Sequence, residues 1–172
     1  MTPKHWFTAV AFAIALPLDL ITKILVDRNL TYADRIPVIE GFFYLTHVRN
    51  PGAAFGLFAD SDPQIRLTLF IGVSIVALFI VFSFFRQLAP GDRLSALALG
   101  LILGGAVGNL IDRVTRGEVV DFLHFRLWRG FSWPDFNLAD AFIVTGVGIL
   151  VLELLASEGE DRASEEPDES AS

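Results

Sequence analysis

Two uncharged apolar stretches decide the fold: LTLFIGVSIVALFIVFSFF at 67–85 and LSALALGLILGGAVGNLI at 94–111. A helix needs about 20 apolar residues to cross the hydrocarbon core of a bilayer. The stretches have 19 and 18 residues and contain no charged side chain, so we predict that both are membrane spans.

The first candidate span, residues 6–26, is interrupted by Asp19 and Lys23. Lys4, the apolar run after it and Ala13-Ile14-Ala15 also fit the three-part pattern of a cleavable signal peptide. The apolar character continues well past that cleavage site, so we expect a membrane span that is retained.

The fourth candidate span, residues 136–156, contains Asp140 near its start and Glu153 near its end. Its uncharged run, 141–152, has 12 residues and by itself also fits a core helix of a soluble protein. Two neighbouring spans already place the chain in a membrane, which favours a fourth. The predicted fold is membrane all-α, a four-transmembrane-helix bundle in a single domain, 1–156, with spans at about 6–26, 65–85, 94–113 and 136–156.

Composition agrees with this fold and excludes several functions. Of the 172 residues, 53% are hydrophobic and 19% are charged, where soluble domains average about a quarter. The formal net charge of −7 lies entirely in residues 153–172, so the body is neutral and is no basic nucleic-acid-binding domain. The chain has no cysteine, which excludes disulfides, thiol nucleophiles and cysteine-ligated metals. Residues 157–172 are polar and acidic, and we expect them to be disordered.

The loops carry weaker signals. Residues 36–39 and 42–48 are β-branched and aromatic and are bounded by turn residues, which predicts a strand or hairpin in the first long loop. A second aromatic stretch, 122–133, precedes the last span. Lysine and arginine occur on both sides of the predicted spans, so the positive-inside rule does not determine the orientation.

Ionisable side chains within spans are costly and indicate function or a buried pair. Asp19 and Lys23 are four residues apart on one helical face and can pair, which also fits a purely structural role. Asn109 and Arg113 are four apart at the end of the third span. They are suited to bind carbonyl groups or a lipid headgroup, or else Arg113 extends its charge to the membrane surface.

Small residues recur every four positions in the third span, at Gly100, Gly104 and Gly108. Such a face allows close contact between helices in a membrane. The segment RNPGAAFG at 49–56 combines a turn signal with small residues that let a backbone approach a ligand, although an ordinary turn has the same composition.

Two further acids have apolar surroundings. Asp121 lies in VVDF at 119–122, and Asp140 follows Asn137 by three residues. If the last two spans pack together, these acids meet at one membrane face. Two carboxylates in a low-dielectric site cannot both ionise easily, so one can act as a base while the other holds a proton. The alternative is two unrelated acids, with Asp140 capping a helix.

Other chemistries have less support. The three histidines are scattered, and no H-E-x-x-H, G-x-S-x-G or glycine-rich phosphate loop occurs.

The whole set resembles the lipoprotein signal peptidase (signal peptidase II) family of bacteria. The resemblance covers most of residues 10–150 and rests on five motifs in the same order. They are DLITK at 19–23, VRNPGAAFG at 48–56, GGAVGNLIDR at 104–113, GEVVDF at 117–122 and FNLADA at 136–141.

The resemblance implies an aspartic endopeptidase of the bacterial inner membrane. Such enzymes remove the signal peptide from prolipoproteins by cutting just before a diacylglyceryl-modified cysteine, and they need no cofactor and no metal. Asp121 and Asp140 match the catalytic pair. The positions matching substrate-binding residues, or lying beside the cut bond, are Asn50, Gly52, Ala53, Asn109, Arg113 and Asn137. The positions matching residues that support the site are Asp19, Lys23 and Gly108.

The resemblance also implies a small extracytoplasmic β-structure in the first loop and a short amphipathic helix before the last span. It places the termini in the cytoplasm and the active site at the outer leaflet. The acidic segment 157–172 departs from the common core of the family, and we interpret it as a cytoplasmic tail. We expect the chain to work as a monomer in membrane lipid. Two other classes remain: a small proton-coupled transporter and a non-catalytic membrane assembly protein. Both differ from a peptidase in that neither cleaves a prolipoprotein.

Overall fold

The computed structural model describes residues 2–52 and 61–165, and four long helices dominate it. All four are long and apolar enough to cross a membrane, which confirms the predicted four-helix bundle. Their outer surfaces expose large apolar side chains, such as Phe79 at 69% and Val144 at 70%, as expected of lipid-facing helices. The helices are α1 (Pro3–Asn29), α2 (Pro63–Gln87), α3 (Arg93–Arg116) and α4 (Leu138–Glu165).

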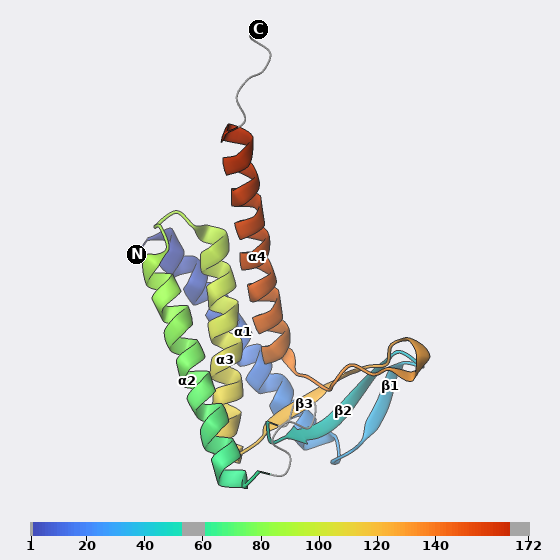
Figure 1. Cartoon of the computed structure of the whole chain (residues 1–172). Coiled ribbons are helices and arrows are strands. Elements are labelled where there is room, and N and C mark those ends of the chain that lie inside the picture. Colours follow the sequence, from blue (N-terminus) through green and yellow to red (C-terminus); the bar gives the residue numbers. More distant parts are fainter. Residues whose placement is uncertain (1, 53–60, 166–172) are drawn as a thin grey trace.

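Helix α3 contacts the other three helices and is the most buried of the four (Figure 1). Its predicted small-residue face packs on α1. Cβ atoms added at Gly100 and Gly104 would lie 2.7 Å from the Cβ atoms of Ala11 and Ala15. Glycine therefore permits a helix contact that any larger residue would push apart.

The strands form a three-stranded antiparallel sheet in the order β1-β2-β3. The strand or hairpin predicted in the first loop is present as β1 (Arg35–Ile39) and β2 (Phe43–Asn50). The third strand, β3 (Val119–Phe125), comes from the segment before the last span and was not predicted. Figure 1 shows the sheet extending sideways from one end of the bundle. The start of α1 and the far end of α4 lie at the opposite end (Figure 1).

Two segments differ in detail from expectation. The short amphipathic helix expected before the last span corresponds to a single 3-10 turn, Trp128–Gly130, because most of that segment pairs as β3. Helix α4 continues to Glu165, nine residues into the segment expected to be disordered from 157. Residues 166–172 lie outside the described part of the chain, as do residues 53–60.

Candidate active site

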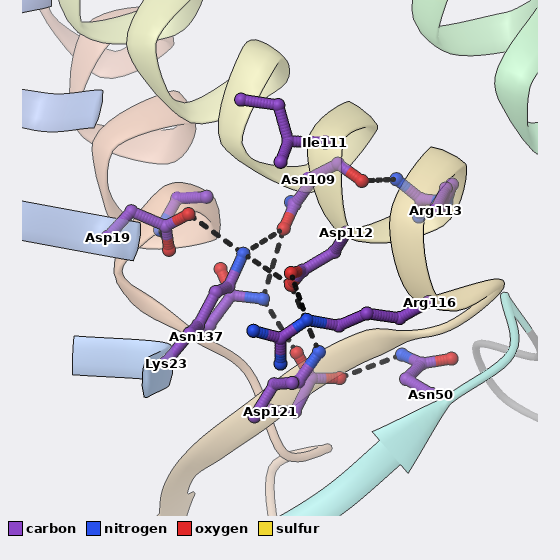
Figure 2. A network of polar contacts seen from close by, with 12 residues as sticks. Asp19, Lys23, Asn50, Asn109, Ile111, Asp112, Arg113, Arg116, Asp121 and Asn137 are labelled. Carbon is purple, nitrogen blue, oxygen red and sulfur yellow. Dashed lines mark hydrogen bonds and ion pairs between the residues drawn. The ribbon is translucent and has the colours of Figure 1, made fainter. Parts of the chain in front are cut away.

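Asp121 lies in the middle of β3 and is 2% exposed. Its carboxylate accepts a hydrogen bond from each of two side-chain amides. Asn50 Nδ2, at the end of β2, donates to Oδ2 at 2.8 Å, and Asn137 Nδ2 donates to Oδ1 at 2.7 Å (Figure 2). Asn50 Oδ1 accepts the backbone N–H of Gly52, which fixes the amide so that its Nδ2 faces Asp121.

Asp140 lies in the first turn of α4, and its carboxylate is half-buried. Asn137 precedes the helix and shares a reciprocal cap with it. Asn137 Oδ1 accepts the backbone N–H of Asp140 at 3.0 Å, and Asp140 Oδ2 accepts that of Asn137 at 3.2 Å. Asn109 Nδ2 of α3 donates to the other carboxylate oxygen at 2.8 Å. Besides capping α4, these hydrogen bonds therefore fix the orientation of the Asp140 carboxylate.

The two amides connect the two acids. Asn137 Nδ2 also lies 3.2 Å from Asn109 Oδ1, so Asn109 and Asn137 form a bridge between Asp140 and Asp121. Both acids line one cavity of about 520 Å³. The packing of α3 against α4 thus brings together the acids that the sequence analysis singled out.

The other predicted binding residues lie around this cavity. Arg113 lines it and stacks its guanidinium over the ring of Phe70 of α2, 5.5 Å from the ring centroid. Gly52 also lines it, with φ +98°, and a Cβ there would overlap the Phe70 ring. Glycine is therefore required at this position for both its backbone conformation and its size. Ala53 lies outside the described residues.

Lys23 of α1 is fully buried, at 0% exposed, and contacts the polar groups that support the site. Its ammonium lies 2.8 Å from Asp19 Oδ2, 2.9 Å from Asn109 Oδ1 and 3.1 Å from Asp112 Oδ2 (Figure 2). A buried charge is tolerated when it is paired and fully hydrogen-bonded, and this arrangement meets both conditions. The Asn109 amide is therefore held with its nitrogen toward Asp140.

Asp19 connects this network to α4. Its Oδ1 accepts the backbone N–H of Ala139 at 2.9 Å, so a carboxylate of α1 satisfies one of the free N–H groups at the start of α4. A Cβ at Gly108 would collide with the Asp19 carboxylate, so the glycine makes room for it. All three residues predicted to support the site are thus in contact with it.

Asp112 was not assigned a role from the sequence. It is 1% exposed, pairs with Lys23 and accepts the backbone N–H of Val120 at 3.3 Å, next to Asp121. The available signal was an acid at the end of an apolar span, directly before an arginine.

The pKa of Asp121 is raised to about 7, chiefly by burial, and the negative charge of Asp140 acts in the same direction. The amides of Asn50 and Asn137 act in the opposite direction, because they favour the ionised form. A buried acid that keeps its proton near neutral pH beside a second carboxylate is an arrangement suited to acid–base hydrolysis.

Such a pair can activate water against an amide, since one carboxylate removes a proton from water while the other donates one to the carbonyl oxygen. Fold and site together define a class, a protein with four helices fit to span a membrane and with two carboxylates on one cavity, an arrangement that suits an aspartic hydrolase.

Comparisons with known proteins lead to the family. The family model for signal peptidase (SPase) II matches residues 11–156. The Lipoprotein signal peptidase of Geobacter metallireducens is 44% identical over 158 residues, covering 92% of this chain and 96% of the relative. That of Geobacter sulfurreducens is 47% identical over 152 residues, covering 88% and 92%.

Solved structures agree with these relatives. One described as a bacterial membrane enzyme has a TM-score of 0.78 at 30% identity, covering 94% of this chain and 93% of its own. A second with the same description has a TM-score of 0.76 at 32% identity, covering 86% and 92%. The chain belongs to the signal peptidase II family, and is therefore a bacterial multi-pass membrane protein and an aspartic peptidase.

Proposed function

We propose that this protein removes the signal peptide from diacylglyceryl-modified prolipoproteins by cutting just before the lipidated cysteine. Family membership supports signal peptide removal from lipoproteins. The observation that carries the assignment of the residues is the convergence of Asp121 and Asp140 on one cavity, each held by amide donors.

In the proposed reaction, water lies between the two acids. Asp140 takes a proton from this water, whose oxygen attacks the carbonyl carbon of the scissile bond, while Asp121 donates its proton to the carbonyl oxygen. The resulting gem-diol then collapses. Asp140 protonates the leaving nitrogen, the C–N bond breaks and a hydroxyl proton returns to Asp121. The leaving nitrogen becomes the α-amine of the lipidated cysteine, the new N-terminus.

We assign substrate binding to Asn50, Gly52, Ala53, Asn109, Arg113 and Asn137. The described members of this set lie on the cavity or hydrogen-bond to the two acids. Arg113 supplies a positive charge on the wall of the cavity, where it can bind carbonyl oxygens of the substrate. We assign Asp19, Lys23 and Gly108 to holding these groups in place.

We further propose that the termini lie in the cytoplasm and the cavity at the outer leaflet of the inner membrane. The substrate's acyl chains and apolar signal helix reside in lipid, so a single copy of the chain can admit them sideways between helices. The end of the bundle that carries the sheet holds both acids, which fits an active site at one membrane surface (Figures 1 and 2).

The test is cleavage by the purified protein in lipid. We expect it to cut a diacylglyceryl-modified prolipoprotein and to leave the same prolipoprotein without the lipid intact. Mass spectrometry of the product should find the lipidated cysteine at the new N-terminus. Equal cleavage of both substrates, or a cut elsewhere, would contradict the proposal.

A further inference from the structure

A polar cluster surrounds Asp27, near the C-terminal end of α1, and one of its members, Arg49, also lines the cavity. Arg49 of β2 donates to Asp27 Oδ1 at 2.7 Å, and Arg116, the last residue of α3, donates to Oδ2. His47 Nε2, also on β2, lies 3.1 Å from Oδ1. One carboxylate therefore joins the C-terminal ends of α1 and α3 to strand β2.

Arg49 is adjacent in sequence to a residue of the active site. It precedes Asn50, whose amide donates to Asp121 at 2.8 Å. In the sheet, Arg49 pairs with Val120 and Asn50 with Val119, so the end of β2 lies beside the part of β3 that carries Asp121. An anchor on the Arg49 side chain thus determines how close Asn50 stays to that carboxylate.

Arg116 is connected through Asp112 to β3, the strand that carries Asp121. Its Nε lies 3.4 Å from Asp112 Oδ1, and Asp112 Oδ2 accepts the backbone N–H of Val120. Both arginines on Asp27 therefore contact groups that hold the Asp121 strand.

The charge pairs around Asp27 are partly exposed. Its side chain is 19% exposed, and those of Arg49 and Arg116 are 29% and 27% exposed. Pairs of this kind contribute little to overall stability. Their effect is geometric, since Arg49 presents a planar fork of donors that fits a carboxylate in few orientations.

We propose that Asp27 is a positioning residue of the active site, which anchors Arg49 so that Asn50 keeps its hydrogen bond to Asp121. The proposal extends the proposed function, because cleavage is one of its two readouts. No motif in the sequence analysis included Asp27.

The test compares Asp27→Asn with the parent protein in lipid. We expect kcat to fall about tenfold, since small displacements of a catalytic group reduce rates strongly. We also expect the decline of activity at high pH to move up by about half a pH unit, because weakening the Asn50 bond removes a contribution that favours ionised Asp121. Glu40→Gln, which removes an exposed acid from the β1–β2 turn, is the matched control and should leave both unchanged.

The variant leaves in place the other charges near Asp121. They are Lys23 of α1, Arg49 of β2, Asp112 and Arg113 of α3, Asp135 of the segment before α4, and Asp140 of α4. Asp27→Asn also removes the carboxylate that pairs with Arg49, and an unpaired Arg49 on the cavity favours ionised Asp121. That effect would move the decline of activity to lower pH, so a shift to higher pH reports on the loss of the Asn50 bond.

Infrared titration provides the second readout and needs no substrate. The protonated carboxyl band of Asp121, identified by its loss in Asp121→Asn, should titrate at higher pH in Asp27→Asn than in the parent. If the parent fails to cleave, the proposed function is wrong while this titration still tests Asp27. In an Asn50→Ala background, Asp27→Asn should add no further shift.

Three results would overturn the inference. The first is parental kcat and pH dependence in Asp27→Asn. The second is a uniform loss of activity with a lower unfolding temperature and an unmoved titration, which would mean fold support alone. The third is an additional shift in the Asn50→Ala background.

Discussion

At the scale of single residues, Asp121 is subject to opposing effects. Burial favours its protonated form, while two amide donors favour the carboxylate. With a pKa of about 7, Asp121 is close to the protonation balance that a general acid needs at neutral pH. The amides of Asn50 and Asn137 therefore limit how far burial raises the pKa of Asp121, and they also hold its carboxylate in place.

This balance predicts the pH dependence of cleavage. The proposed mechanism needs the Asp121 proton, so kcat should fall as pH rises through about 7. Asn50→Ala removes a donor to the ionised form and should move this decline to higher pH. The measurement is kcat at saturating lipidated substrate between about pH 5 and 9. A rate that stays constant across that range would contradict the assignment of Asp121 as the acid.

Lys23 offers a test of the buried network. Lys23→Met should lower the free energy of unfolding by about 3 kcal/mol, because it leaves the Asp19 carboxylate buried without its cation and Asp112 paired with Arg116 alone. Adding Asp112→Asn should recover part of that loss. Denaturant unfolding in detergent measures both, and a double variant less stable than Lys23→Met would contradict the account.

The sequence could predict most of these side chains because intramembrane polar groups are few and stand out against an apolar background. Asp19, Lys23, Asn109 and Arg113 were found in this way. Their partners were harder to predict. The contact of Asp19 with the backbone of Ala139 joins residues 120 positions apart, and no local spacing indicates such a bond.

At the scale of helices, the small-residue face of α3 was predicted, but its partner was not. The structure pairs it with Ala11 and Ala15 of α1, which repeat at the same interval of four. The two helices run in the same direction, since Gly100 meets Ala11 and Gly104 meets Ala15. This contact sets how closely Asp19 approaches the start of α4.

Gly104→Val tests that contact. The added side chain meets Ala15 Cβ and the backbone of Leu16, so we expect the variant to lose about 1–3 kcal/mol of stability. Gly148→Val in α4 is the matched control, because a Cβ there meets no atom within 4 Å. Thermal unfolding in detergent compares the two, and equal loss in both would contradict a specific α1–α3 contact.

Strand β3 was the element that the sequence analysis missed. VVDFLHF has five apolar residues of seven around one acid, which does not alternate clearly enough to indicate a strand. Its partner, β2, comes from the first loop, roughly 70 residues earlier, so the pairing is non-local. Only tertiary contact makes Asp121 part of a sheet and brings its carboxylate within hydrogen-bond distance of the Asn50 amide.

At the scale of the whole molecule, the orientation proposal can be tested directly because the chain has no cysteine. A single cysteine at Glu40, in the β1–β2 turn, should react with a membrane-impermeant maleimide in intact spheroplasts. One at Gly91, between α2 and α3, should react only after permeabilisation. The reverse pattern would contradict an active site at the outer leaflet.

The central claim is that Asp121 and Asp140 together activate water. The measurement that tests it most directly is single-turnover cleavage of a lipidated prolipoprotein by Asp121→Asn and by Asp140→Asn, with Glu118→Gln as the control acid beside β3. We predict that each Asn variant folds, binds substrate and loses cleavage by at least about a thousandfold, while Glu118→Gln cuts like the parent. Substantial cleavage by either folded Asn variant would contradict the claim.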